Sequence, residues 1–170
     1  MGQRRGVPKR RGGIDMASVL DHMKFAPVGY VVKDIDAARE SYAKLFGVPV
    51  PRVQPSGYGA ANTVYKGNPV PDSHCKLAFF SLSSGVQLEL IEPDEGPSTW
   101  REYLDAHGEG IHHIAFIVKD MDRVVRECMA EGMTVVQQGN YDDNSGHYTY
   151  LDGSEKYKCV IELLESFPRK

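Results

Sequence analysis

Two stretches of this chain repeat each other. Residues 25–36 read FAPVGYVVKDID, and residues 111–122 read IHHIAFIVKDMD, which aligns with the first stretch without a gap. Two later stretches also match, because residues 86–93 read VQLELIEP and residues 159–166 read CVIELLES. A chain of 170 residues has room for two small modules that share one core. We therefore expect two copies of one module, each beginning and ending with a matched segment.

The first matched segment of each copy alternates in the manner of a β-strand. Large apolar residues recur at every second position, so they share one face of the strand. They are Val28, Tyr30 and Val32 in the first copy and Ile114, Phe116 and Val118 in the second. The opposite face carries Pro27 and Gly29 in the first copy and His113 and Ala115 in the second. The small residues on this face leave room for another group beside the strand.

A helix is expected after each of these strands. Asp34 and Asp120 stand where a carboxylate can accept the free backbone N–H groups of a helix start. Gly47 and Gly132 stand where a helix ends in the left-handed conformation. Apolar residues recur between these signals at helical spacing. They are Ile35, Ala38, Tyr42, Leu45 and Phe46 in the first helix, and Met121, Val124, Val125, Cys128 and Met129 in the second.

Further strands complete each copy. Alternating patterns predict strands at 61–66, 76–82 and 86–92, and again at 133–138, 147–152 and 158–165. The order βαβββ thus occurs twice, and helices beside mostly antiparallel strands give the fold class α+β. The predicted organisation is a disordered basic tail (1–20), a first module (24–93), a linker with a short helix capped by Ser98 (94–110), and a second module (111–166).

Charge and composition exclude several classes of partner. Residues 1–18 hold five Lys or Arg and one Asp, a charge of +4, and the net charge of −3 leaves −7 for the remainder. An acidic body without interleaved basic and aromatic residues argues against nucleic acid. No apolar run reaches the roughly 18–20 residues of a membrane-spanning helix. Three cysteines without a CxxC spacing favour the reducing cytoplasm. We expect a small-molecule partner.

Three residues are candidates for a metal site. Period two places Glu89 and Glu162 on the strand face opposite their aliphatic neighbours, at equivalent positions of the two copies. A carboxylate buried among aliphatic residues is costly unless it is paired, protonated or bound to a cation. His113 lies on the small-residue face of its strand, in register with Glu89 and Glu162. The alternative is that the two strands lie at sheet edges with solvated glutamates and that His113 is an ordinary core residue. His112, on the other face, is expected to be structural or exposed.

The sequence resembles the vicinal oxygen chelate (glyoxalase/bleomycin resistance/dioxygenase) superfamily over residues 24–166, and the segments quoted above look most like its methylmalonyl-CoA epimerase and glyoxalase I branches. This resemblance implies cupped mixed sheets with the helices outside, and usually a homodimer. It also implies a divalent metal (Co, Ni, Zn, Mn or Fe) held by the first and last strands of both modules. The corresponding ligands here are Glu89, His113 and Glu162. The fourth position is Pro27, which has no donor atom.

The resemblance implies a metal-dependent isomerase, epimerase or lyase. Such an enzyme transfers a proton next to the carbonyl of a thioester or a 2-oxo or hydroxy compound, with Glu162 or Glu89 as the candidate base. One alternative is a metal-free small-molecule binding protein of the drug-resistance type, which Pro27 favours. A third hypothesis is an extradiol-type dioxygenase, which needs a second histidine, and His147 is the candidate for it. His147, Tyr148 and Tyr150 are weaker candidates for substrate contact, since they could equally belong to a surface strand.

Overall fold

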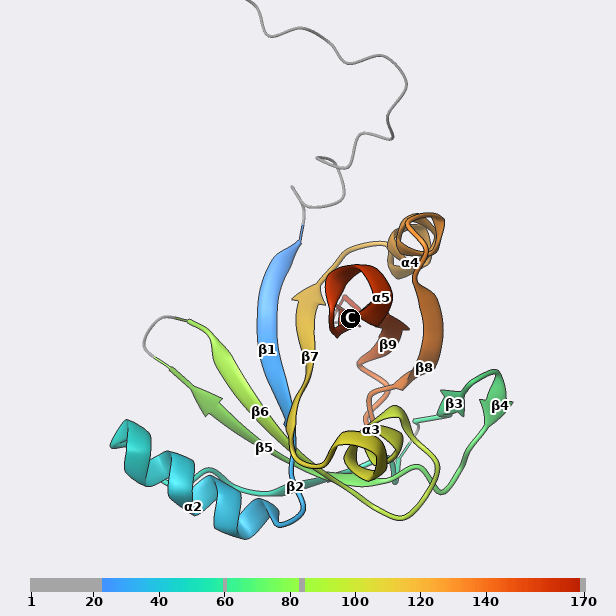
Figure 1. The fold of residues 1–170 in the computed structure, drawn as a ribbon. Helices are drawn as coiled ribbons and strands as arrows, with labels where there is room; N and C mark the ends of the chain where they lie inside the picture. Colours follow the sequence, from blue (N-terminus) through green and yellow to red (C-terminus); the bar gives the residue numbers. More distant parts are fainter. Residues whose placement is uncertain (1–22, 60, 83–84, 169–170) are drawn as a thin grey trace, which may run out of the picture.

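The computed structural model describes residues 23–59, 61–82 and 85–168, in which ten strands form one curled mixed sheet (Figure 1). The strand order is β2-β5-β6-β1-β7-β10-β9-β8-β3-β4. The α+β class and the paired modules are therefore confirmed. The predicted tail at 1–20 lies outside the described residues.

Each module contributes four strands and one long helix to this arrangement. The first consists of β1 (Lys24–Val31), α2 (Ile35–Phe46), β2 (Gln54–Ser56), β5 (Cys75–Ser81) and β6 (Gln87–Pro93). The second consists of β7 (Gly110–Ile117), α4 (Met121–Ala130), β8 (Thr134–Asn140), β9 (Gly146–Asp152) and β10 (Val160–Ser166). The helix α3 (Thr99–His107) connects the modules, and the short α5 (Ser154–Tyr157) lies between β9 and β10.

The two modules join through their first strands. β1 and β7 pair antiparallel at the centre of the sheet, while β1 pairs in parallel with β6 and β7 pairs in parallel with β10. The β1–β7 ladder has two irregularities, one between Phe25 and Val28 and one between Gly29 and Tyr30. At the second irregularity Gly29 faces His113 and Tyr30 faces Ile111, so His112 is a bulge residue.

One predicted strand was placed in the wrong module. Of residues 61–66, only Val64–Tyr65 are extended (β3), and they pair with β4 (Asn68–Pro69) and with β8 of the second module. The third strand of the first module is instead β2, which pairs with β5. The extended segment is short because Asn62 and Lys66 have positive φ angles of 45° and 47°.

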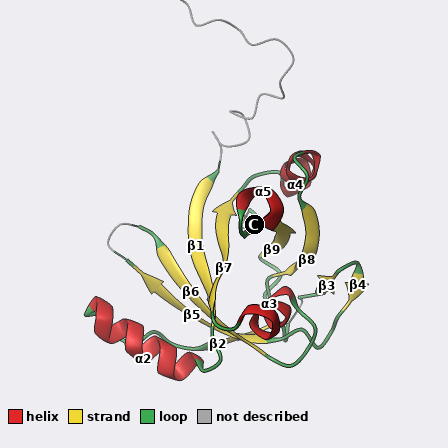
Figure 2. Cartoon of the chain, in the orientation of Figure 1, coloured by secondary structure: helices red, strands yellow, loops and turns green. Residues whose placement is uncertain are grey.

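The predicted faces of the strands are confirmed by the packing. Val32, Leu88 and Leu90 pack with α2 on the outer side, and Ile161 and Leu163 pack with α4. Figure 2 shows the two helices far apart, each beside strands of its own module. The inner side of the sheet carries a separate cluster with α3. Its buried members are Val31, Cys75, Ile91, Trp100, Leu104 and Tyr150.

The helices begin at the residues that the capping signals predicted, but two residues of the predicted apolar stripes are exposed. Asp34, Asp120 and Ser98 each accept a backbone N–H at a helix start. Leu45 and Met129 were expected to be buried, but they are 74% and 51% exposed. At 100° per residue both lie at the edge of their stripe, away from the sheet. No helix in the described part of the chain is long and apolar enough to cross a membrane.

Candidate metal centre

Three of four neighbouring strands bring Glu89, His113 and Glu162 together on the inner side of the sheet. Glu89 on β6 and His113 on β7 both lie opposite Gly29 of the intervening β1, and Glu162 on β10 lies opposite Ala115 of β7. One potential ligand atom from each of the three side chains lies within 4.8 Å of the others. The duplicated strands thus place two carboxylates symmetrically and add one imidazole from a single module.

The imidazole of His113 occupies the space beside Gly29. A Cβ atom on Gly29 would lie 1.9 Å from His113 Cε1, a separation that no real contact allows. The sequence predicted room beside the small-residue face, and the group that fills this room is the His113 ring. Glycine is therefore required at position 29 for His113 to point toward both carboxylates.

The three side chains are almost completely buried. His113 Nε2 lies 3.4 Å from Glu89 Oε2 and 3.2 Å from Glu162 Oε2, and the exposed side-chain fractions are 0% for His113, 8% for Glu89 and 7% for Glu162. His113 Nε2 has no hydrogen-bond partner of acceptable geometry in the described residues. The alternative of solvated glutamates at sheet edges is wrong, because β6 and β10 each lie between two other strands.

Burial and mutual attraction change how these groups hold protons. Burial raises the pKa of Glu89, and the charge of Glu162 adds to this effect. Burial alone would lower the pKa of His113, but Glu162 and Glu89 outweigh it and raise the pKa to about 9. Two ionised carboxylates and one protonated imidazole carry a net charge of −1. A divalent cation with a neutral imidazole would make the same group neutral, which suits a buried site.

The donor set fits a divalent transition metal. An unpartnered imidazole nitrogen faces two carboxylate oxygens, and nitrogen and oxygen ligands of this kind suit Zn²⁺, Co²⁺, Ni²⁺, Mn²⁺ or Fe²⁺. Pro27 lines the same cavity and offers no ligand atom. Three protein ligands leave open positions, which is the arrangement of catalytic rather than structural metal sites.

A second row of side chains holds His113 in place. His112 Nδ1 lies 3.0 Å from His113 Nδ1, and His112 Nε2 lies 3.1 Å from Thr99 Oγ1. The Thr99 backbone N–H in turn donates to Gln137 Oε1. Burial and the neighbouring His113 lower the pKa of His112 well below its usual value, so this ring is neutral. His112 is 2% exposed, so it is not solvent-exposed. The prediction that it lies on the other face of the strand is wrong, because at the bulge its ring contacts those of His113 and Tyr150 on the inner side.

This arrangement fixes the tautomers of both rings. If His113 uses Nε2 toward the carboxylates or a metal, its Nδ1 carries the proton and donates to His112 Nδ1. His112 then carries its own proton on Nε2 and donates to Thr99 Oγ1. Sequence reasoning did not identify Thr99 or Gln137, since nothing in the pattern around them indicates which distant residue they contact.

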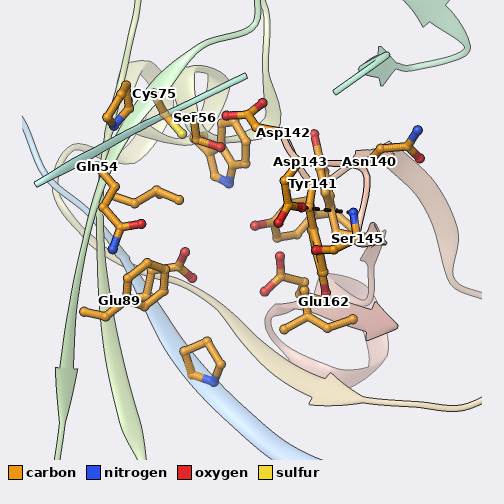
Figure 3. Close-up of a pocket in the computed structure, with 18 residues that line it drawn as sticks. Gln54, Ser56, Cys75, Glu89, Asn140, Tyr141, Asp142, Asp143, Ser145 and Glu162 are labelled. Carbon is orange, nitrogen blue, oxygen red and sulfur yellow. Dashed lines mark hydrogen bonds between the residues drawn. The ribbon is translucent and has the colours of Figure 1, made fainter. Parts of the chain in front are cut away.

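A cavity of about 460 Å³ opens above the two carboxylates. Figure 3 shows Glu89 and Glu162 pointing toward the same space from opposite walls, with polar residues of the β8–β9 loop above Glu162. The lining residues outside the predicted set come from β2, β5, α3 and the β8–β9 loop. They include Gln54, Ser56, Cys75, Phe79, Trp100, Asn140, Tyr141, Asp142, Asp143 and Ser145. The volume lies within the usual range for small-molecule sites.

The β8–β9 loop also ties the two modules together across the cavity. The Asp142 carboxylate accepts the backbone N–H groups of Gly57, at 3.0 and 3.1 Å, and of Gly59, at 3.0 Å. Gly59 has no space for a side chain, because an added Cβ would lie 2.3 Å from the Asp142 carbonyl oxygen. Asp142 therefore has a fixed position at the rim of the cavity.

The weaker candidates on β9 divide into two groups. Tyr148 and Tyr150 line the cavity, and the Tyr150 ring centroid lies 5.1 Å from that of His113. His147 does not line it. Its Nε2 lies 2.9 Å from Glu165 Oε2, and its ring packs against Phe167. His147 therefore does not supply the second histidine that an extradiol-type dioxygenase requires.

Comparisons with known proteins identify the family and agree with the fold. A family model described as the glyoxalase/bleomycin resistance protein/dioxygenase superfamily matches residues 27–150. The uncharacterised protein YqjC of Bacillus subtilis (strain 168) is 24% identical over 147 residues, which cover 86% of this chain and 91% of YqjC.

Two similar solved structures share the fold at low sequence identity. The methylmalonyl-CoA epimerase of Mycobacterium tuberculosis superposes with a TM-score of 0.59 at 24% identity, covering 85% of this chain and 88% of the epimerase. A variant of the Streptomyces coelicolor methylmalonyl-CoA epimerase, in complex with 2-nitronate-propionyl-CoA, gives 0.58 at 24% identity, covering 86% and 99%.

Proposed function

The chain belongs to the glyoxalase/bleomycin resistance protein/dioxygenase superfamily, and on that premise we propose that it is a metal-dependent isomerase, epimerase or lyase that moves a proton on a carbon next to a carbonyl. The observation that carries this proposal is the convergence of Glu89, His113 and Glu162, with an unpartnered imidazole nitrogen, at the base of a cavity. These three residues would hold the metal.

The bound metal would supply a Lewis acid that stabilises negative charge on the oxygen of a chelated carbonyl. The protein supplies the proton chemistry. Glu89 and Glu162 both line the cavity, and the carboxylate that faces the substrate carbon takes the α-proton and returns it. His112 would hold the His113 ring in place through the contact between their Nδ1 atoms.

Two neutral donors would orient the substrate. Burial and the charges of Glu162 and Glu89 raise the pKa of the Tyr150 hydroxyl well above its usual value, so it keeps its proton. Trp100 lines the cavity, and its buried Nε1–H makes no hydrogen bond of acceptable geometry in the described residues. Both groups can donate to an oxygen of a bound carbonyl compound. The three free thiols, Cys75, Cys128 and Cys159, support the cytoplasmic setting that we propose for this reaction.

Proton exchange with solvent tests the proposal. The Co²⁺-loaded protein is incubated in D₂O with hydroxyacetone and with a 2-hydroxyacyl thioester, and NMR follows the α-proton signal. We expect exchange in the wild type and a decrease of at least about 10²–10⁴-fold in Glu89→Gln or Glu162→Gln, because each substitution removes a candidate general base and a metal ligand together. Glu155→Gln, at an exposed position on α5, is the control. Exchange that is absent from the loaded wild type, or unchanged in both variants, would contradict the proposal.

A metal-free binding protein is the second candidate, and one observation favours it. The protonated His113 can itself neutralise part of the carboxylate charge, and Pro27 provides no fourth ligand. In that case the protein would bind its small molecule equally well in the presence of a chelator. Ligand binding that disappears when the metal is removed would exclude this candidate.

A further inference from the structure

All the charged side chains that line the cavity, within the described part of the chain, have the same sign. Four carboxylates contribute, namely Glu89, Glu162, Asp142 and Asp143, and no lysine, arginine or histidine belongs to the lining. Glu89 and Glu162 lie at the base beside His113, whereas Asp142 and Asp143 lie in the β8–β9 loop at the rim (Figure 3). The two pairs therefore differ in what can neutralise them.

A divalent cation would compensate the pair at the base but not the pair at the rim. Asp142 is held by the backbone N–H groups of Gly57 and Gly59, and Asp143 accepts the backbone N–H of Ser145. The described residues include no ion pair to either aspartate. The hydrogen bonds to Ser145 lower the pKa of Asp143, so its carboxylate is ionised at neutral pH. A loaded site therefore keeps two negative charges at its entrance.

The remaining walls are aromatic or carry uncharged donors. Five aromatic side chains line the cavity: Phe79, Trp100, Tyr141, Tyr148 and Tyr150. The faces of such rings attract cations. Trp100 Nε1–H is buried and makes no hydrogen bond of acceptable geometry in the described residues, so it can donate to a neutral oxygen of a ligand. The wall thus offers contacts to neutral and positively charged groups and no cation for an additional carboxylate.

We propose that this cavity selects a compound that is neutral or cationic apart from its two chelating oxygens, such as a hydroxyketone or an ammonium-bearing analogue, and disfavours one with an additional carboxylate. This inference rests on the proposed function, because it treats the cavity as the substrate site. A like charge beside a partly exposed carboxylate lowers affinity by about tenfold, and an opposite charge raises it by a similar factor.

Three hydroxamates that share one chelating group test the charge preference. Acetohydroxamic acid is neutral at its other end, succinic monohydroxamic acid carries a carboxylate there, and trimethylammonioacetohydroxamic acid carries a cation. In calorimetric titration of the Zn²⁺-loaded protein, we expect the affinity to decrease from the cationic to the neutral to the anionic hydroxamate, by about tenfold at each step. Asp143→Asn should reduce the ratio of the affinity for the cationic hydroxamate to that for the anionic one several-fold. Asp122→Asn, an exposed position on α4 outside the cavity lining, should not.

Each outcome separates this inference from the proposed function. Succinic monohydroxamic acid binding as tightly as acetohydroxamic acid would overturn the inference while leaving the metal site intact. If the protein takes up no Zn²⁺, the proposed function fails. The charge preference is then measured without metal, with benzyltrimethylammonium against benzoate in a thermal-shift titration. Stabilisation by the ammonium compound alone supports the inference, and stabilisation by benzoate overturns it.

Discussion

The two modules have the same residue in their last strand and different residues in their first strand. Glu89 and Glu162 occupy equivalent positions and lie 3.4 and 3.2 Å from the same imidazole nitrogen. Pro27 and His113 are also equivalent, yet only His113 has a donor atom. Two residues further along each strand, the first module has Gly29 and the second has Ala115. Gly29 leaves room for the His113 ring. The duplication built the cavity, and the differences between the first strands determine its chemistry.

A second pair of equivalent residues shows what the modules kept in common. Glu92 accepts the Ile35 backbone N–H at the start of α2 and pairs with Lys76. Glu165 accepts the backbone N–H groups of Asp120 and Met121 at the start of α4 and pairs with His147. Each last strand therefore anchors the helix of its own module. By this comparison His147 corresponds to Lys76, and its role is structural.

Removing the differing residues should have unequal effects. In metal-free protein His113→Ala leaves two buried carboxylates without a positive partner, which is expected to cost about 3–5 kcal/mol of unfolding free energy. Pro27→Ala removes the equivalent residue of the other module and should cost no more than about 1 kcal/mol, the usual effect of losing a proline. Urea denaturation of both variants measures the difference. Equal losses would mean that the asymmetry has no energetic role.

Making Gly29 resemble its counterpart should disturb the His113 ring. Gly29→Ala introduces a Cβ where the ring lies, and we expect a loss of about 1–3 kcal/mol through overpacking. The double variant Gly29→Ala/His113→Ala is the matched control, since it removes the ring that clashes. Denaturation should show no further loss relative to His113→Ala alone. A Gly29→Ala protein as stable as the wild type would refute this packing argument.

His112 has no polar counterpart in the first module, where Ala26 is equivalent. His112→Phe removes the acceptor for His113 Nδ1–H and should weaken divalent metal binding by about 10–100-fold, the usual effect of losing such a hydrogen bond. His112→Asn keeps an acceptor near Nδ1 and should retain much of the affinity. Titration with Co²⁺ measures both. Identical affinities for His112→Phe and the wild type would show that His112 does not position His113.

The smallest effects are expected where the modules agree. His147→Ala and Lys76→Ala each remove a partly exposed polar contact to a glutamate, so each should cost less than about 1 kcal/mol. Neither should change metal affinity, because neither residue lies in the metal site. A loss of metal binding in His147→Ala alone would restore His147 as a candidate ligand.

The sequence pattern predicted what depends on local periodicity. Alternation in the matched strands identified the inward face, and with it Glu89, His113 and Glu162, because side chains two residues apart share a face. The capping residues Asp34, Ser98 and Asp120 likewise predicted where the helices start. These predictions rest on neighbours in the chain and on a register that the second copy repeats.

Contacts between distant loops could not be predicted in this way. Asp142 bonds to Gly57 across 85 residues, and Thr99 bonds to Gln137 across 38. Both contacts depend on how far the sheet curls and on bulges, such as the one at His112, that no alternating pattern reveals. The strand predicted at 61–66 was assigned to the wrong module for the same reason, since its pairing with β8 depends on how the whole sheet curls.

The measurement that tests the metal site most directly is the stoichiometry of divalent metal in protein purified with Co²⁺ or Zn²⁺ supplied, determined by elemental analysis. We predict one ion per chain in the wild type and in His147→Ala, and almost complete loss in Glu162→Gln and His113→Ala. No ion in the wild type, or equal occupancy in all four proteins, would contradict the assignment of Glu89, His113 and Glu162 as a metal site.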